Sequence, residues 1–173
     1  MKIELPFTLP GVTVLGVVTD INDDIIITVE TTESSTTCRL CQKELTKRHG
    51  SDKPLKLRHT AVFATHTYIV YKPHRYICDD CDNSPTTTAT PSWHKQGSHC
   101  TIDYENNVLV SVIHSTIADV MMKEQLSESV IYGIIGRHIE SKINWANIDS
   151  LGVIGIDEIS LKKGHGDYVT IVT

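Results

Sequence analysis

The stretches CRLC at residues 38–41 and CDDC at residues 78–81 decide how the first half of the chain folds. A structural zinc ion takes four tetrahedral ligands, and cysteine thiolates are among the best of them. Each CxxC turn lets two sulfurs point at one ion, so Cys38, Cys41, Cys78 and Cys81 together predict one zinc site. The two pairs lie further apart than in an ordinary zinc ribbon. Because the intervening sequence is strand-rich, the extra length predicts an added β-hairpin.

Two alternatives to a shared metal ion are disulfides and two unrelated cysteine pairs. Cys100, His94 and His99 are possible substitute ligands, although an ordinary role in the linker is expected for them. No apolar run reaches the roughly 18 residues that span a bilayer, and the start MKIELPFTLP does not resemble a secretory signal. We therefore expect no membrane association and a reducing cytoplasm, where cysteines bind metal more often than they form disulfides.

The sequence on either side of the first cysteine pair predicts strands. Residues 11–31 are rich in Val and Ile and indicate two strands around a turn at Asn22 and Asp23. Residues 55–64 and 65–78 predict further strands, preceded by a turn around His49, Gly50 and Ser51. Residues 82–99 are rich in Pro, Ser and Thr, and their composition predicts a linker.

Positive charge is concentrated between residues 36 and 77, although the whole chain has a formal net charge of −5. Binding to a phosphate backbone depends on local Lys and Arg density more than on total charge. This block therefore predicts contacts to DNA phosphates, and a solvated face of a small β module is the alternative. The candidate contact residues in the block are Lys47, Arg48, Lys53, Lys56, Arg58, Lys72 and Arg75.

Apolar residues adopt helical spacing from Thr101 to about Ser141. Ser115 or Thr116 can cap one helix, the sequence Gln125-Leu126-Ser127 predicts a turn, and Ser127 can cap the next helix. This arrangement is typical of a helix-turn-helix, in which the start of the second helix reads bases in the major groove. Ser129, Tyr132 and Arg137 are then candidate DNA contacts. A helical hairpin that only fills a core has the same spacing.

An apolar strand at Leu151–Ile159 is interrupted by Asp157 and Glu158, and a basic turn at residues 162–165 leads into another apolar strand. A carboxylate on such a strand can bind the Mg²⁺ ions of a phosphoryl-transfer enzyme. The alternative is an Asp157 that begins a turn and points into water.

In this order, CRLC, HRYICDDC, STIADVMMKEQLSES and LGVIGIDEISLKKGHGDYVTIVT resemble the DDE transposases of the ISL-three group of bacterial insertion sequences. The resemblance covers nearly the whole chain and implies an α+β fold with three parts. Residues 1–99 would be a β-rich zinc-binding module and linker, and residues 100–148 a helix-turn-helix segment. Residues 149–173 would start an RNase H-like catalytic domain, with Asp157 as its first catalytic acid.

The resemblance also implies a function in transposition. The partner would be double-stranded DNA at the terminal inverted repeats, in a bacterial cytoplasm near the nucleoid, and a homo-oligomer or a full-length transposase is a possible partner. The family's other two acids follow the hairpin, so the 173 residues alone are expected to lack strand transfer, and Mg²⁺ is expected only in a complete relative. The alternatives are a zinc-dependent DNA-binding transcriptional regulator and a protein-interaction module.

Overall fold

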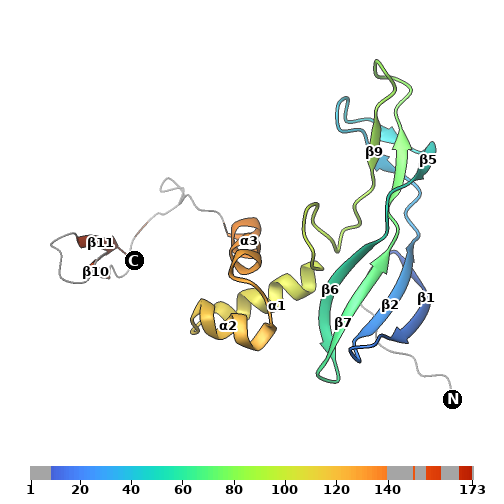
Figure 1. The fold of residues 1–173 in the computed structure, drawn as a ribbon. Coiled ribbons are helices and arrows are strands. Elements are labelled where there is room, and N and C mark those ends of the chain that lie inside the picture. Colours follow the sequence, from blue (N-terminus) through green and yellow to red (C-terminus); the bar gives the residue numbers. More distant parts are fainter. Residues whose placement is uncertain (1–8, 140–149, 151–154, 161–167, 173) are drawn as a thin grey trace. The chain divides into compact units, whose positions relative to one another are not determined.

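The computed structural model describes residues 9–139, 150, 155–160 and 168–172. The chain divides into two compact units, Met1–His138 and Ile139–Thr173. Among the described residues, the first unit contains all of the cysteines and three helices, and the second contains one β-hairpin (Figure 1). The described residues thus form a strand-rich mixed α/β structure, in agreement with the α+β class expected from sequence.

A four-stranded sheet with the order β1-β2-β7-β6 forms one core of the first unit. It contains β1 (Val12–Thr19), β2 (Ile25–Thr31), β6 (Leu55–Val62) and β7 (Thr65–Tyr71). The β1–β2 and β6–β7 pairs are antiparallel hairpins, as the sequence predicts, whereas β2 and β7 are parallel. Apolar side chains on one face of the sheet are buried together, namely Leu9, Ile27, Val29, Leu57, Ile69, Tyr71 and Trp93.

Five shorter strands form the end of the first unit that carries the cysteine pairs. Two of them, β3 (Thr36–Thr37) and β4 (Glu44–Leu45), pair with each other. The remaining three form a sheet in the order β5 (Arg48–Ser51), β8 (His74–Ile77) and β9 (Thr86–Thr88).

The prediction of a turn at residues 49–51 is wrong, because these residues lie in β5. The turn-like composition has a different cause. The register between β5 and β8 shifts between Arg48 and Ser51, and Gly50 adopts a φ of +88° there. Glycine takes such a backbone conformation without the steric cost that other residues meet.

The prediction that residues 82–99 form a linker is also wrong. This segment contributes β9, and Ala89 packs in the core below the cysteines. Trp93 lies edge-on to Tyr71, with ring centroids 5.0 Å apart, and covers the four-stranded sheet. Composition suggested a linker because polar residues surround the one large apolar side chain that anchors the segment.

The three helices are α1 (Ile102–Val112), α2 (Ile117–Glu124) and α3 (Glu128–His138). Thr116 caps α2 in a capping box with Asp119, and Gln125 ends the helix in a left-handed conformation with a φ of 54°. The predicted turn therefore lies between α2 and α3. Buried side chains from all three helices form a second core, namely Tyr104, Val108, Val120, Ile131 and Ile134 together with Cys100.

The start of α1 is attached to β6 of the large sheet. His59 Nδ1 lies 2.8 Å from the hydroxyl of Thr101, the residue that caps α1. The Arg58 guanidinium lies over two aromatic rings, 5.2 Å from the Tyr68 centroid and 5.5 Å from that of Tyr104. These contacts join the helices to the sheet within one unit. The boundary expected after residue 99 lies inside that unit.

The second unit contains β10 (Ile156–Ser160) and β11 (Tyr168–Val172), which pair antiparallel. The strand–turn–strand order agrees with the sequence prediction, although residues 151–154 and 161–167 lie outside the described residues. The expected boundary after residue 148 also lies outside them. Within the described ranges, no helix has both the length and the apolar character that a bilayer crossing requires.

Candidate metal centre and nucleic-acid interface

The first cysteine pair lies in a tight turn between β3 and β4. The Cys38 carbonyl accepts a hydrogen bond from Gln42 N at 3.0 Å, and Cys38 N donates to the Lys43 carbonyl at 2.8 Å. The Leu40 amide lies 3.5 Å from Cys38 Sγ and donates to it. Amides of Cys41 and Leu40 stabilise the thiolate and lower the pKa of Cys38 to about 6. The turn thus favours the charge state that binds metals.

The second cysteine pair lies in a similar turn, which follows β8. Cys78 N donates to the Pro85 carbonyl at 3.0 Å, and Ser84 N donates to the Cys81 carbonyl at 3.1 Å. Asn83 and Ser84 both have positive φ, which folds the chain back sharply towards β9. The two cysteines therefore project from the end of a strand towards the first turn.

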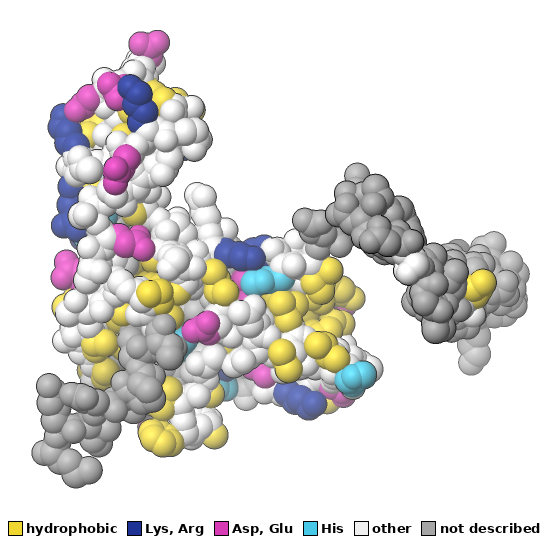
Figure 2. Space-filling model, turned by 180° about the vertical axis from the view of Figure 1, so that it is seen from behind, with side chains coloured by type: hydrophobic (Ala, Val, Ile, Leu, Met, Phe, Trp, Pro, Cys, Tyr) yellow, Lys and Arg dark blue, Asp and Glu magenta, His cyan; other side chains and the backbone are white. Residues whose placement is uncertain are grey.

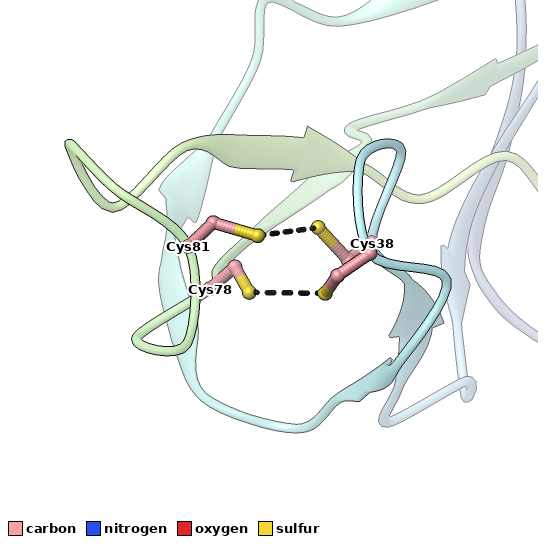
Figure 3. Close-up of side chains that lie close together, drawn as sticks. Cys38, Cys78 and Cys81 are labelled. Carbon is pink, nitrogen blue, oxygen red and sulfur yellow. Dashed lines mark hydrogen bonds between the residues drawn. The ribbon is translucent and has the colours of Figure 1, made fainter.

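The four sulfur atoms converge on one point (Figure 3). Cys38 Sγ lies 4.0 Å from Cys81 Sγ, Cys41 Sγ lies 3.6 Å from Cys78 Sγ, and all four sulfurs lie within 4.8 Å of one another. Four sulfurs at about 2.3 Å from a tetrahedral zinc ion would be separated by roughly 3.8 Å. The cluster fits this geometry and can hold a metal ion such as zinc.

Apolar side chains pack against one side of the four-cysteine cluster. Cys38 and Cys78 are buried with Leu45, Tyr76 and Ala89. Tyr76 is 1% exposed, and its hydroxyl donates to the Glu33 carbonyl at 3.2 Å. Both turns therefore pack against buried side chains, which hold the sulfur atoms in place.

The alternative ligands lie elsewhere in the first unit. His94 accepts a hydrogen bond from the Tyr71 hydroxyl at 2.8 Å and donates to the Ser98 carbonyl at 2.9 Å, so both ring nitrogens have structural partners. Cys100 packs in the helical core, where burial raises the pKa of its thiol to about 11. His99 is exposed. None of the three belongs to the four-cysteine cluster.

Several basic candidates of the 36–77 block are paired with acids. Lys47 Nζ lies 2.8 Å from Asp79, and Lys43 Nζ, which is not among the candidates, lies 3.1 Å from Asp80, so both link the first cysteine turn region to the second. Arg75 Nε lies 3.4 Å from Asp52. Figure 2 shows basic and acidic side chains alternating at this end of the unit. Exposed pairs of this kind contribute little to stability, and their cations remain accessible to other anions.

The other candidates of this block divide into two groups. Lys56 and Arg58 lie on the large sheet and contact the Tyr68 ring, and Lys56 also lies 3.5 Å from Asp20. Arg58 is half-buried, and its guanidinium also packs against the Tyr104 ring of α1. Its main role is therefore structural. Arg48, Lys53 and Lys72 have exposed side chains near the strands β5 to β8.

The residues predicted on α3 have different environments. Ser129 and Tyr132 lie in the first half of the helix with exposed side chains, and Tyr132 is 55% exposed. Ile131 and Ile134, on the opposite face, are fully buried against the other two helices. Arg137, near the end of the helix, forms an ion pair with Glu105 of α1.

Glu105 is a site residue that the sequence analysis missed. Its carboxylate is fully buried and accepts hydrogen bonds from Ser98 Oγ at 2.6 Å, Arg137 Nε at 2.9 Å and His138 Nε2 at 2.6 Å. Burial opposes its ionisation, but these three donors outweigh the burial and hold the pKa of Glu105 below its usual value. The sequence offered no signal, because Arg137 and His138 lie more than thirty residues from Glu105 along the chain.

Lys95 completes this charged cluster. Its ammonium group donates to the Arg137 carbonyl at 3.0 Å and lies 3.4 Å from His138 Nδ1. An ammonium group has no lone pair, so this contact requires Nδ1 to be the acceptor and leaves the ring proton on Nε2, facing Glu105. The cluster ties the last turn of α3 to α1 and to the segment before it.

Asp157 lies in β10, opposite Ile171 of β11. Its position on a strand of an antiparallel hairpin agrees with the strand placement expected from sequence. Its side chain lies outside the described part of the chain.

Neither a protein-family model, nor a curated protein, nor a solved structure matches this chain. The described residues form a strand-rich α/β unit with a four-cysteine cluster that can hold a metal ion. Three helices belong to the same unit.

Proposed function

We propose that this chain is the DNA-recognition part of an insertion-sequence transposase, which binds double-stranded DNA at transposon ends. The observation that carries the proposal is the arrangement of α2 and α3. The two helices meet at the short turn Gln125–Ser127, and α3 directs Ser129 and Tyr132 outward while Ile131 and Ile134 pack inward. A helix-turn-helix presents its recognition helix to the major groove in this way.

The four cysteines would hold zinc in a purely structural role. Four thiolates occupy all four positions of a tetrahedral ion, so no position remains for water or substrate. The metal would hold the β5-β8-β9 sheet, which carries Arg48 and Arg75, in one conformation. Those side chains, together with exposed Lys53 and Lys72, are the proposed phosphate contacts.

The β10–β11 hairpin would begin an RNase H-like catalytic domain, and Asp157 would be its first metal-binding acid. The support is the resemblance of GIDEISLKKGH to the opening hairpin of the ISL-three transposases, together with the antiparallel pairing of the two strands. In a complete enzyme of this class, acids on such strands hold the Mg²⁺ ions that promote phosphoryl transfer.

The test is recovery of bound fragments from sheared genomic DNA at moderate salt, with a chelated sample in parallel. The proposal expects enrichment of inverted repeats that flank copies of this gene, and loss of the enrichment on chelation. Enrichment of a promoter region would instead favour a zinc-dependent transcriptional regulator. Recovery no greater than in the chelated sample would contradict both readings and favour a protein-interaction module.

Replacing Tyr132 with alanine should weaken binding to the recovered sequence about 5- to 150-fold, because a lost base contact costs about 1–3 kcal/mol. Replacing Lys53 with alanine should instead weaken binding to all sequences alike and lower the salt slope by about one. Both effects are measured by fluorescence anisotropy at several salt concentrations. Val110→Ala, an exposed change on α1, serves as the control and should leave affinity unchanged. Equal affinities for wild type and Tyr132→Ala would exclude α3 as the recognition helix.

A further inference from the structure

The strand β1 forms one edge of the four-stranded sheet, and its side chains remain exposed on both faces. Val14, Leu15, Val17 and Val18 are 45%, 62%, 51% and 61% exposed. An edge strand that faces water ordinarily alternates apolar and polar residues and carries a lysine or proline that prevents further pairing. The sequence VTVLGVVT contains neither lysine nor proline. Among the described residues, β2 is the only strand that pairs with β1.

The apolar rows of the sheet core continue into β1 and end there. Ile27 of β2 lies beside Ile69 of β7 on one side and beside Val17 of β1 on the other. Val29 likewise lies between Tyr71 and Val14. Both rows are buried in β2 and β7, yet their last members in β1 are about half exposed. The core of the sheet is therefore open at this edge.

The opposite face of the sheet has an apolar hollow beside the same strand. A shallow pocket of about 280 Å³ is lined by Leu15, Pro54 and Val70, with Lys72 and His74 at its polar side. Leu15 is the extra residue at an irregularity of the β1–β2 register between Val14 and Gly16. Such a bulge increases the local twist, and regular pairing resumes from Gly16 to Thr19.

We propose that β1 is an interface at which a second copy of this chain pairs edge to edge, with the two β1 strands antiparallel about a twofold axis. Antiparallel pairing about a twofold axis places residue i opposite residue j and residue j opposite residue i, and only residues next to the axis face their own counterparts, so a charge near the middle of the strand would meet the same charge. The eight residues of β1 carry no charge, which removes this repulsion. The exposed valines of each copy would extend the apolar rows of the other.

This pairing would join the two sheets into one, in which β1 strands meet at the centre and β6 strands form the outer edges. If two paired eight-residue strands bury roughly 1,000 Å² in total, the interface is smaller than the roughly 1,200–2,000 Å² of stable complexes and falls among weak, transient ones. We therefore expect a dimer that forms at tens of micromolar chain and dissociates on dilution. The inference does not depend on the proposed DNA-binding function.

The experiment is sedimentation equilibrium of the zinc-loaded full chain over a hundredfold range of concentration. We expect the wild-type mass to approach twice the monomer mass at high concentration. Val18→Lys should remain monomeric throughout, because a lysine on an edge strand prevents a further strand from pairing with it. Met122→Lys introduces the same charge at an exposed position on α2 and should dimerise like the wild type. Circular dichroism and zinc content check that each variant is folded.

Hydrogen exchange of the β1 amides provides an independent measurement. The outward-facing β1 amides, which do not donate to β2, should gain protection as the wild-type concentration rises and stay unprotected in Val18→Lys at every concentration. A wild type that is monomeric at every concentration would overturn the proposal. This holds even if its β1 amides are protected, because protection in a monomer would mean that another part of the chain covers the strand. A dimer unaffected by Val18→Lys would also overturn it.

Discussion

Replacing Cys78 with serine should abolish stoichiometric zinc binding and unfold the β5-β8-β9 sheet. Cys78 is a buried member of the four-cysteine cluster and also packs on Tyr76 and Ala89. Structural zinc contributes apparent binding free energies of about 10–16 kcal/mol in small zinc-binding peptides, which is comparable to the whole stability of an ordinary domain. Elemental analysis of the purified protein measures the bound zinc, and amide hydrogen exchange locates the unfolded strands.

The fifth cysteine provides a matched control for this experiment. Cys100 is buried in the helical core and lies outside the cluster, so Cys100→Ala should keep one zinc ion per chain. Chelation of the wild type should reproduce the Cys78→Ser result. A chelated wild-type chain with unchanged exchange in β5, β8 and β9 would show that the cluster needs no metal.

Replacing Glu105 with glutamine should lower the free energy of unfolding of the first unit by about 3 kcal/mol. The substitution keeps the size of the side chain but removes the charge that Arg137 and His138 face, and a buried ion that loses its partner is strongly destabilising. Because the Arg137 side chain is 29% exposed and keeps some contact with water, the expected loss lies at the lower end of the usual range. Urea unfolding followed by circular dichroism measures it.

The same residue predicts a pH dependence. The folded-state pKa of Glu105 lies below its usual value, so its stabilising contribution is complete above the unfolded-state pKa of about 4.3. The contribution is lost as the pH falls below that value, through the folded-state pKa. Wild-type stability should therefore decrease more steeply below about pH 4 than that of Glu105→Gln. Parallel curves for the two proteins would contradict this assignment.

Glu128, which is exposed in the first turn of α3, provides the comparison for Glu105. Glu128→Gln should change the free energy of unfolding by no more than about 0.5 kcal/mol, as expected for a surface substitution. A loss as large as that of Glu105→Gln would indicate that overall charge, rather than the buried cluster, determines the stability of the helices.

Local chemistry made the cysteine cluster and most of the secondary structure predictable from sequence. Two CxxC turns constrain their sulfurs so strongly that convergence was expected, and the four sulfurs do converge, whereas the identity of the metal stays a prediction. The hairpin around Asn22 and Asp23 and the turn at Gln125–Ser127 also follow from nearby residues, and both are confirmed.

Long-range contacts were not predictable in this way. Residues 82–99 have the composition of a linker, and their structural role depends on Trp93 meeting a sheet formed by distant strands. Arg137 suits a phosphate contact by its position on α3, but the structure pairs it with a buried carboxylate that has no local sequence signature. The parallel pairing of β2 with β7 was likewise invisible, because no short-range pattern links two strands so far apart.

That parallel pairing also constrains when the protein can fold during its synthesis. The β1–β2 hairpin leaves the ribosome first, but its apolar rows have no neighbour until β7 has been made, since Ile27 packs beside Ile69. Cys78 and Cys81 follow β7 almost directly, so the large sheet and the four-cysteine cluster are completed within the same short stretch of elongation. Pairing between such distant segments is slow, and an unpaired apolar hairpin is prone to aggregate. A nascent chain that stalls before β7 therefore leaves the apolar rows of the β1–β2 hairpin unpaired until translation resumes.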